Sequence, residues 1–483
     1  MTPRPAAETL SPLDSFFLYL ESARTPMHTG SVGIFEGAPM RDRRGRLRMR
    51  AIRSEVDSRL HLVPKLRQRV RFPLFGEASP VWVDDPDFDV ANHVLETFLP
   101  SPGTEAQLLE FSANLMSLPL DRGRPLWEIW FVDGLAGDRV ALVEKLHHSM
   151  ADGLAGVELA TVLLDLERRP LHSHAPPPDW QPSPPPSRVT AVTRDVIRRA
   201  TLPMKVGAGA LEVLHHPVRA GREAARYGEA LSTVASRRSI APRCSLNTEI
   251  GEKRRLVVVR QPMDELHHAQ WRFGVTINDL LLAAVAAGVH DLLAGRGEDV
   301  EGGSVQVLVP VGTEHHGDHK LGNQVSAMIV RLPIGDADPI DRLHAVSRTE
   351  ARCKRHHQAL VGELLLDLLE PWPQPALAAA TRLVHRQPFV NLVVSNVPGP
   401  GLPLYAMGSL MLEAIPIVPL AGNLSVGIAA LSYEGQLTIG IFADPDACPD
   451  VSVLAEGMSR AFAEVVGYPT TLESPAKKES TAL

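Results

Sequence analysis

The spacing of apolar residues switches several times along the chain between a helical period and a strand period. Apolar positions three or four residues apart predict helices at residues 10–20, 51–70, 105–118, 154–166, 263–273 and 280–293. Short alternating or continuous apolar runs predict strands at 31–35, 81–83, 127–132, 139–146, 254–260, 305–310, 324–332, 389–395, 424–430 and 436–442. Strands and helices are therefore mixed through both halves of the chain.

Changes in composition divide this pattern into segments. Residues 169–187 hold a proline cluster, LHSHAPPPDWQPSPPPS, that predicts an exposed, semi-rigid linker. Residues 188–243 are helical in pattern and basic, with eleven Lys and Arg against four Asp and Glu. We predict a first domain at 1–168, a linker and basic connector at 169–245, a second domain at 246–468 and a disordered tail at 469–483.

Overall charge and cysteine content exclude several classes of protein. The chain has 483 residues, of which 44% are hydrophobic, so it can bury a large core. A net charge of −7 and a pI near 6.3 argue against a nucleic-acid-binding protein, which would be basic. The three cysteines lie far apart without metal or redox spacing, as expected for free thiols in a reducing cytoplasm.

The strongest chemical signal lies where the strand 139–146 ends. His147 and His148 follow this strand, and Asp152 and Gly153 precede the predicted helix at 154–166. Successive strand side chains point to opposite faces, so the two histidines are not expected to serve one reaction centre. A histidine held there can act as a general base near neutral pH. Asp152 suits a helix N-cap, and Gly153 suits a tight turn.

A purely structural role for the histidine pair stays open at this point. Four other histidine pairs begin at residues 215, 267, 315 and 356, but none has an Asp-Gly at this spacing between a strand and a helix. No HExxH motif, CxxC motif or second ligand pair supports zinc, so no metal site is expected.

The spacing HHxxxDG is the signature of acyltransferases built like chloramphenicol acetyltransferase, a superfamily that includes the condensation domains of peptide synthetases. Three further motifs distinguish among the members of this superfamily: Pro125-Leu126-Trp127, Asn278-Asp279 and the segment SNVPGP that contains Asn396. Together they resemble the bacterial bifunctional wax ester synthase/acyl-CoA:diacylglycerol acyltransferase (WS/DGAT) family, from about residue 10 to about residue 450.

This resemblance implies an α/β fold of the α+β type. We expect two chloramphenicol-acetyltransferase-like domains, each a mixed β-sheet packed with helices, and an active-site channel between them. It further implies an O-acyltransferase that moves a fatty acyl group from acyl-CoA to diacylglycerol or a long-chain alcohol. Acyl-CoA is a substrate in this reaction, and no cofactor is implied.

The resemblance also assigns roles to single residues. His148 is the expected base, Asp152 sets its surroundings and His147 completes the catalytic motif. The residues expected to contact substrate are Pro125, Leu126, Trp127, Gly153 and Asn396. Packing is an equally good explanation for Trp127, and capping of a turn for Asn396. Asn278 and Asp279 are expected to start the helix at 280–293.

Two other functions remain open from the sequence. One is a condensation-type enzyme that takes its acyl group from a carrier protein, and the other is a non-catalytic lipid-body protein. The longest strongly apolar run, 280–289, is shorter than the roughly 20 residues of a membrane span. No signal peptide is expected either, because the N-terminus lacks an apolar core. We therefore expect a cytoplasmic protein at the surface of the membrane or of lipid bodies. The basic segment 188–243 either presents a solvated helical face or contacts the anionic lipid surface.

Overall fold

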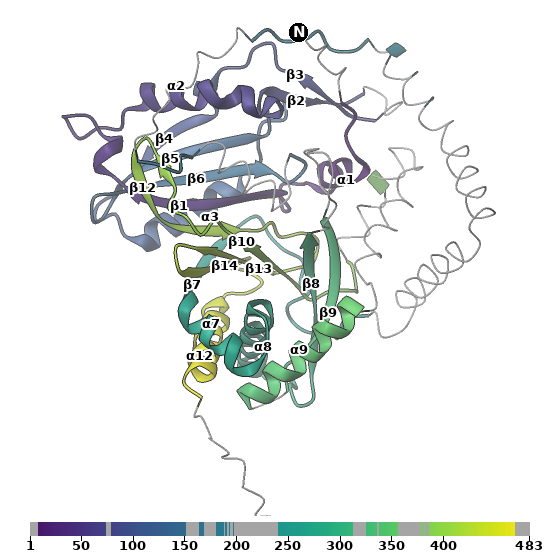
Figure 1. The fold of residues 1–483 in the computed structure, drawn as a ribbon. Helices are drawn as coiled ribbons and strands as arrows, with labels where there is room; N and C mark the ends of the chain where they lie inside the picture. The colour runs from purple at the N-terminus through teal and green to yellow at the C-terminus, as the bar shows by residue number, and fades with distance from the viewer. Residues whose placement is uncertain are drawn as a thin grey trace, which may run out of the picture.

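Two six-stranded β-sheets and a separate two-stranded hairpin form the frame of the protein (Figure 1). This is a computed structural model, and it describes residues 8–73, 79–150, 164–168, 180–187, 189–190, 193, 197, 240–312, 325–335, 338–355, 378–379, 381 and 386–468. The predictions for the helix at 154–166, the connector at 188–243 and the tail at 469–483 lie wholly or mostly outside these residues.

The first sheet has the order β11-β12-β1-β6-β5-β4. Only β4 and β5 pair in parallel, so the sheet is mixed. Its strands are β1 (His28–Glu36), β4 (Val94–Phe98), β5 (Trp127–Leu135), β6 (Arg139–His147), β11 (Tyr405–Ala406) and β12 (Ser409–Ile417). The predicted hairpin at 127–146 is therefore confirmed as β5 and β6, and the hairpin outside the sheets is β2 (Gln68–Arg71) with β3 (Val81–Asp84).

The second sheet has the order β7-β14-β13-β10-β8-β9, and it is also mixed. The central strand β10 pairs in parallel with both of its neighbours, β13 and β8. The strands are β7 (Arg255–Pro262), β8 (Ser304–Gly312), β9 (Val325–Pro333), β10 (Leu392–Pro398), β13 (Val426–Tyr433) and β14 (Gln436–Ala443). Two mixed sheets confirm the fold expected from the sequence.

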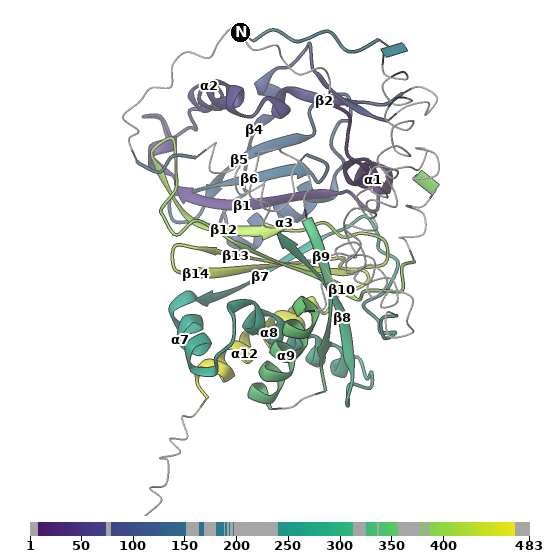
Figure 2. The same cartoon turned by 45° about the vertical axis from the view of Figure 1, so that its right-hand side comes forward.

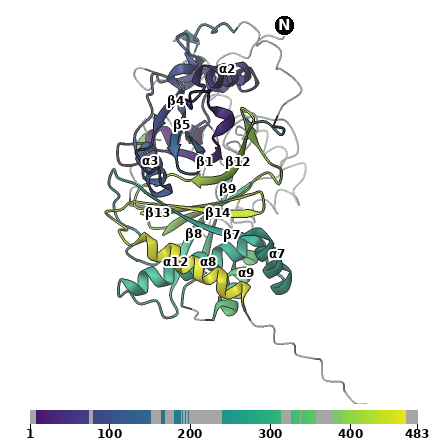
Figure 3. The same cartoon turned by 90° about the vertical axis from the view of Figure 1, so that its left-hand side faces the viewer.

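Helices pack against both sheets (Figure 3). On the first sheet, Leu142 packs in one core with Ile52 of α2, and Val143 packs on the other face with Leu108 of α3. Four of the helices that the structure describes cover one face of the second sheet and share its apolar core. The helices are α1 (Pro12–Leu20), α2 (Met49–Arg59), α3 (Glu105–Ser117), α7 (Met263–Phe273), α8 (Ile277–Gly295), α9 (Pro339–Arg355) and α12 (Val451–Val466). Short 3-10 helices are η1 (Ala38–Met40), η2 (Leu60–Leu62), η3 (Pro64–Arg67) and η4 (Val90–Asn92).

β12 connects the two halves, because it comes from the C-terminal part of the chain and yet belongs to the first sheet (Figure 2). It pairs with β1 from Gly30↔Ile417 to Phe35↔Met411. The two sheets approach closely at Gly440 of β14, where a Cβ atom would lie 2.0 Å from the carbonyl oxygen of Pro416 in β12. The first sheet therefore contains strands from both parts of the chain, and no single position in the sequence separates the residues of the two sheets.

The helix expected over residues 51–70 is only half present. α2 ends at Arg59, two short 3-10 helices follow, and β2 begins at Gln68. Pro64 lies inside the expected range, and the preceding residue, Val63, has φ −131° and ψ 76°. A proline disfavours helical backbone at the residue before it, which explains why the helix does not continue.

α8 begins three residues earlier than expected. Its N-cap is Thr276, whose hydroxyl accepts a hydrogen bond from the Asp279 N–H at 3.1 Å, and the Asp279 carboxylate accepts from the Thr276 N–H at 2.8 Å. This reciprocal capping box confirms that Asp279 acts at the helix start. Asn278 is not a cap: its amide oxygen accepts from the Asn396 amide at 3.3 Å.

Among the described helices, α8 alone is long and apolar enough to cross a membrane by length and composition. Its most apolar stretch is 72% buried inside the protein. It packs against α7, α9 and α12, as the central helix of a protein core does.

The capping box makes a prediction about stability. Asp279→Ala should lower the free energy of unfolding by roughly 0.5–2 kcal/mol, because it removes the reciprocal cap and the acceptor of the Ser347 hydroxyl at 3.2 Å. Asn278→Ala should cost less, because Asn278 caps nothing. Chemical denaturation of both variants, with Thr276→Ala as the matched control, tests this; an equal loss for Asn278→Ala would contradict the assignment.

Candidate active site

β6 carries the histidine pair to the edge of the site. His147 is its last residue and is fully buried, whereas His148 is partly exposed. The backbone N–H of His148 donates to the carbonyl of Met27 at 2.7 Å, which continues the ladder toward β1. The two side chains therefore leave the strand on opposite faces, as strand alternation predicts.

Local hydrogen bonds and burial hold His147 neutral. Its Nδ1 accepts from the Ser149 N–H at 3.1 Å and lies 2.7 Å from the Ser149 hydroxyl. Burial lowers the pKa of His147 to about 3, so the ring carries no charge at neutral pH. With Nδ1 accepting, these partners assign the proton to Nε2, which lies 3.6 Å from Glu21 Oε1.

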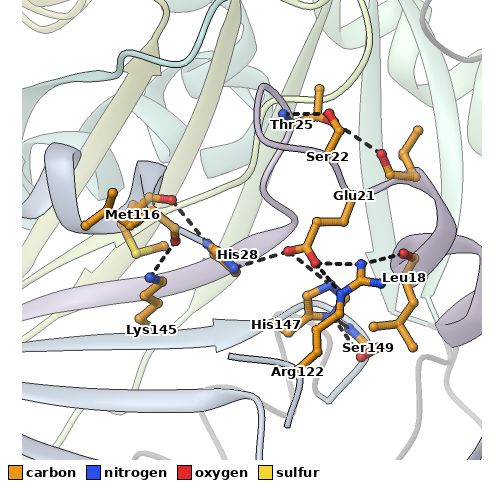
Figure 4. Close-up of polar contacts among 12 residues, drawn as sticks. Leu18, Glu21, Ser22, Thr25, His28, Met116, Arg122, Lys145, His147 and Ser149 are labelled. Carbon is orange, nitrogen blue, oxygen red and sulfur yellow. Dashed lines mark hydrogen bonds and ion pairs between the residues drawn. The ribbon is translucent and has the colours of Figure 1, made fainter. Parts of the chain in front are cut away.

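Glu21, the residue after α1, is the centre of a buried polar cluster that the sequence analysis did not identify (Figure 4). Its Oε1 lies 3.3 Å from His28 Nε2, and its Oε2 accepts from Arg122 Nη2 at 2.7 Å. Burial alone would raise the pKa of Glu21, but the contacts with His28, His147 and Arg122 outweigh burial and hold it well below its usual range. The site thus contains an ionised carboxylate beneath His147.

The C-terminal end of α3 binds the same face of the sheet. His28 Nδ1 lies 3.1 Å from the carbonyl oxygen of Met116, and Lys145 Nζ donates to the carbonyl of Leu118 at 2.6 Å (Figure 4). Burial lowers the pKa of Lys145 to about 8, against the opposing effect of Glu128 at 4.0 Å. Both side chains satisfy carbonyls that the helix end leaves without partners. His28 thus has a backbone carbonyl beside one ring nitrogen and the Glu21 carboxylate beside the other.

The opposite face of β6 borders a pocket between the two sheets. Alternation places Glu144, Leu146 and His148 on this face, and the His148 ring lies 4.1 Å from the Phe17 ring, centroid to centroid. The pocket has about 1010 Å³ of empty space, including its open part, and β1, β6, β10, β12 and β13 contribute most of its described lining. That lining is mainly apolar, with Thr29, Ser31 and Glu144 among the exceptions.

Glu144 is the acidic residue in the described lining of this pocket. The Ser31 hydroxyl donates to its Oε2 at 3.1 Å, and burial raises the pKa of Glu144 to about 7. Glu144 is not among the residues predicted from the sequence. Its position four residues before His148, hence on the same strand face, was the available signal.

Pro125, Leu126 and Trp127 pack in the core beneath the site. Trp127 is 2% exposed, its indole N–H donates to the Leu66 carbonyl at 2.7 Å, and its ring stacks on His93 at 4.5 Å. The structure thus confirms the packing role, and a substrate contact by these residues stays a prediction.

Asn396 connects two of the sequence motifs. Within β10 it faces the start of α8, because Ser395 and Val397 line the pocket and Val394 packs in the core under the helices. Its amide donates to Asn278 at 3.3 Å. This contact is structural, and a substrate contact stays a prediction. Asp152 and Gly153 lie outside the described residues, and no group of three or more potential metal ligands occurs in the part of the chain that the structure describes.

A protein of two mixed sheets, with a histidine pair at the end of a central strand beside a pocket between the sheets, has the architecture of chloramphenicol-acetyltransferase-like acyltransferases. The solved structures that share this fold include the following two. A wax ester synthase/diacylglycerol acyltransferase from Marinobacter aquaeolei VT8 matches with a TM-score of 0.64 and 24% identity, over 95% of this chain and 100% of that one. The first condensation domain of the calcium-dependent antibiotic synthetase matches with a TM-score of 0.60 and 17% identity, over 96% and 97%.

Sequence comparison narrows this class to one family. Residues 10–281 match the wax ester synthase/diacylglycerol acyltransferase catalytic domain, and residues 321–465 match the WS/DGAT C-terminal domain. A Mycobacterium tuberculosis protein named as a probable diacylglycerol O-acyltransferase is 35% identical over 463 residues, which cover 95% of each chain. The chain belongs to the WS/DGAT family of acyltransferases.

The raised pKa of Glu144 predicts a pH-dependent stability difference. Folding favours the protonated carboxyl. Glu144 therefore does not lower the free energy of unfolding below about pH 4.5, and it lowers it increasingly as the pH rises to about 7. Glu144→Gln should therefore gain up to about 3 kcal/mol over the wild-type protein across this window. Denaturation of both proteins at several pH values between 4 and 8 tests this, with a substitution of the exposed Glu96, Glu96→Gln, as a control; a constant difference would contradict the raised pKa.

Proposed function

We propose that the protein transfers a fatty acyl group from acyl-CoA to the hydroxyl of diacylglycerol or a long-chain alcohol, forming triacylglycerol or a wax ester. The observation that carries this proposal is the position of His148 in a WS/DGAT-family chain: it lies at the end of β6, on the strand face that borders the apolar pocket. An apolar pocket between sheets suits a lipid substrate.

The proposed chemistry requires one base. His148 takes the proton of the acceptor hydroxyl while its oxygen attacks the thioester carbonyl. The tetrahedral intermediate then collapses, the C–S bond breaks, and the proton passes from His148 to the departing CoA thiolate. A positioned general base of this kind contributes ~10²–10⁴-fold.

In this mechanism the buried cluster positions the base without touching substrate. His147 is neutral and bound to Ser149, and the ionised Glu21 lies on the far side of the sheet from the pocket. Their role is to hold the end of β6, and with it the backbone of His148, in one conformation.

The direct test measures ester formation with purified protein. A panel of acyl-CoA donors is combined with diacylglycerol and long-chain alcohols, and the products are identified by mass spectrometry. Acyl transfer from CoA is the expected outcome. Absence of ester with every pair, or transfer only from an acylated carrier protein, would refute the proposal, the latter in favour of a condensation-type enzyme.

The two histidines should respond differently to substitution. His148→Ala should reduce kcat by ~10²-fold or more with little change in melting temperature, because it removes only the base. His147→Ala should retain more activity and lose stability, because it removes a buried residue that binds Ser149 and faces Glu21. Near wild-type turnover by His148→Ala, with His147→Ala inactive, would overturn the assignment.

Asp152 has a separate test. Asparagine caps a helix about as well as aspartate does. If Asp152 only caps, Asp152→Asn keeps its stability and most of its activity; if the charge orients the site, activity falls sharply at unchanged stability. We expect the second result, measured as kcat beside the melting temperature.

We also propose that the protein binds the membrane or lipid-body surface peripherally from the cytoplasmic side, through the basic segment 188–243. Each basic group near an anionic surface contributes about 1 kcal/mol, and salt screens this attraction. Sedimentation with anionic and neutral vesicles at low and high salt measures it. Equal binding to both vesicle types would rule out the electrostatic attachment.

A further inference from the structure

A second cavity lies on the N-terminal half of the protein, apart from the pocket between the sheets. Its walls are β2, β3, residues 122–123 and residues 182–185 of the proline-rich segment, and its cavity volume is about 580 Å³. Binding sites for small molecules have volumes of roughly 300–1,000 Å³, so the cavity is large enough for one.

The cavity is basic. Three arginines line it, Arg69, Arg71 and Arg122, and Asp84 is the acidic residue in the described lining. The Asp84 carboxylate is already bound, because it accepts from the Ser183 N–H at 2.9 Å and from Gln68 at 3.1 Å. It therefore binds wall groups of the cavity. Outside the lining, Arg122 pairs with Glu21 and Arg69 lies near Asp85, so Arg71 is the lining arginine whose charge has no carboxylate partner in the described part of the chain.

The arginines keep donors available for a ligand. In the part of the chain that the structure describes, Arg71 contacts only the Pro186 carbonyl, at 3.3 Å, and forms no ion pair. Arg69 donates to the Gly123 carbonyl at 3.0 Å and lies 3.6 Å from Asp85. Each guanidinium has five N–H groups, so contacts of this number leave several unused.

The cavity adjoins the candidate active site through α1. Arg122 donates to the Leu18 carbonyl at 2.7 Å and to Glu21, and the preceding α1 residue, Phe17, has its ring 4.1 Å from the His148 ring. Figures 1 and 2 agree in showing β2 close to α1. Arg122 and His148 therefore both contact the same short helix.

Arginine guanidinium groups bind phosphates with paired, charge-assisted hydrogen bonds. In the proposed reaction the donor carries its phosphates on a nucleotide, separated from the thioester by the long pantetheine arm. We propose that the cavity of Arg69, Arg71 and Arg122 binds the phosphates of acyl-CoA, while the thioester extends past α1 to His148. This inference rests on the proposed function, and it names the donor site.

The experiment compares two donors that share an acyl thioester. Acyl-CoA has the nucleotide and its phosphates, and the acyl thioester of N-acetylcysteamine lacks both. Arg71→Ala and Arg69→Ala/Arg71→Ala should raise KM for acyl-CoA by ~10-fold or more, and leave kcat/KM for the short thioester within about twofold. Arg71→Lys should restore part of the affinity, because it restores the charge without the paired geometry.

A matched control exists in the second sheet. Arg255 is exposed, and its guanidinium donates to the Pro449 carbonyl at 3.3 Å, the same contact that Arg71 makes with Pro186. Arg255→Ala should leave KM for acyl-CoA unchanged. An equal loss with both thioesters and a lowered melting temperature would show that Arg71 only holds the proline-rich segment, and would overturn the proposal.

Calorimetry with CoA alone measures binding at this site independently of acyl transfer. Wild-type protein should bind CoA with ~10-fold or more higher affinity than Arg71→Ala, and high salt should reduce the difference. CoA binding can be measured even if no acceptor is acylated. Failure to acylate any acceptor would refute the proposed function but not the CoA site. Unchanged CoA binding, with weakened binding of Arg71→Ala to phosphatidylglycerol vesicles, would assign the arginines to a lipid headgroup and overturn the donor site.

Discussion

The ionised carboxylate of Glu21, buried between His28, His147 and Arg122, is the interaction on which the geometry of the site depends (Figure 4). A buried charge is costly unless it is paired, so the carboxylate draws these groups together. They come from the end of α1, the start of β1, the end of β6 and the loop before β5. One charge thereby fixes four segments at the point where the catalytic motif begins.

β1 carries this constraint into the rest of the protein. It pairs with β6 along nine positions, from His28↔His147 to Glu36↔Arg139, and on its other edge with β12 from the C-terminal part of the chain. The strand that anchors His147 through His28 is therefore also the strand that joins the two halves. The pocket between the sheets is built on the same strands, so its shape and the position of His148 are coupled through β1 and β6.

Strand alternation separates two environments along β6. One face carries Lys145 and His147, which bind the end of α3 and the polar cluster and lie away from the pocket. The other face carries Glu144, Leu146 and His148 and borders the pocket. A buried histidine and a partly exposed histidine beside the pocket can be neighbours in sequence, because a strand turns consecutive side chains to opposite sides.

Local patterns in the sequence determined the elements and the family. Apolar periodicity identified β5, β6 and α8, and the spacing of HHxxxDG with the PLW, ND and SNVPGP motifs indicated the acyltransferase family that the comparisons show. Apolar periodicity gave a wrong prediction at residues 60–70, where Pro64 prevents the helix from continuing although the apolar spacing continues. Strand alternation also predicted that His147 and His148 face opposite sides.

Contacts between distant segments were decided by the tertiary structure alone. Glu21 and Arg122 are about a hundred positions apart, and nothing local to either residue indicates a buried ion pair. The insertion of β12 beside β1 likewise follows from how the two halves of the chain pack together, and the pairing of Asn278 with Asn396 follows from how α8 packs on the second sheet. Periodicity reports which face of an element is buried, but it does not identify the partner. The partner depends on packing across the whole chain, and for that reason the cluster beneath His147 and the arginine-lined cavity became visible only in the folded structure.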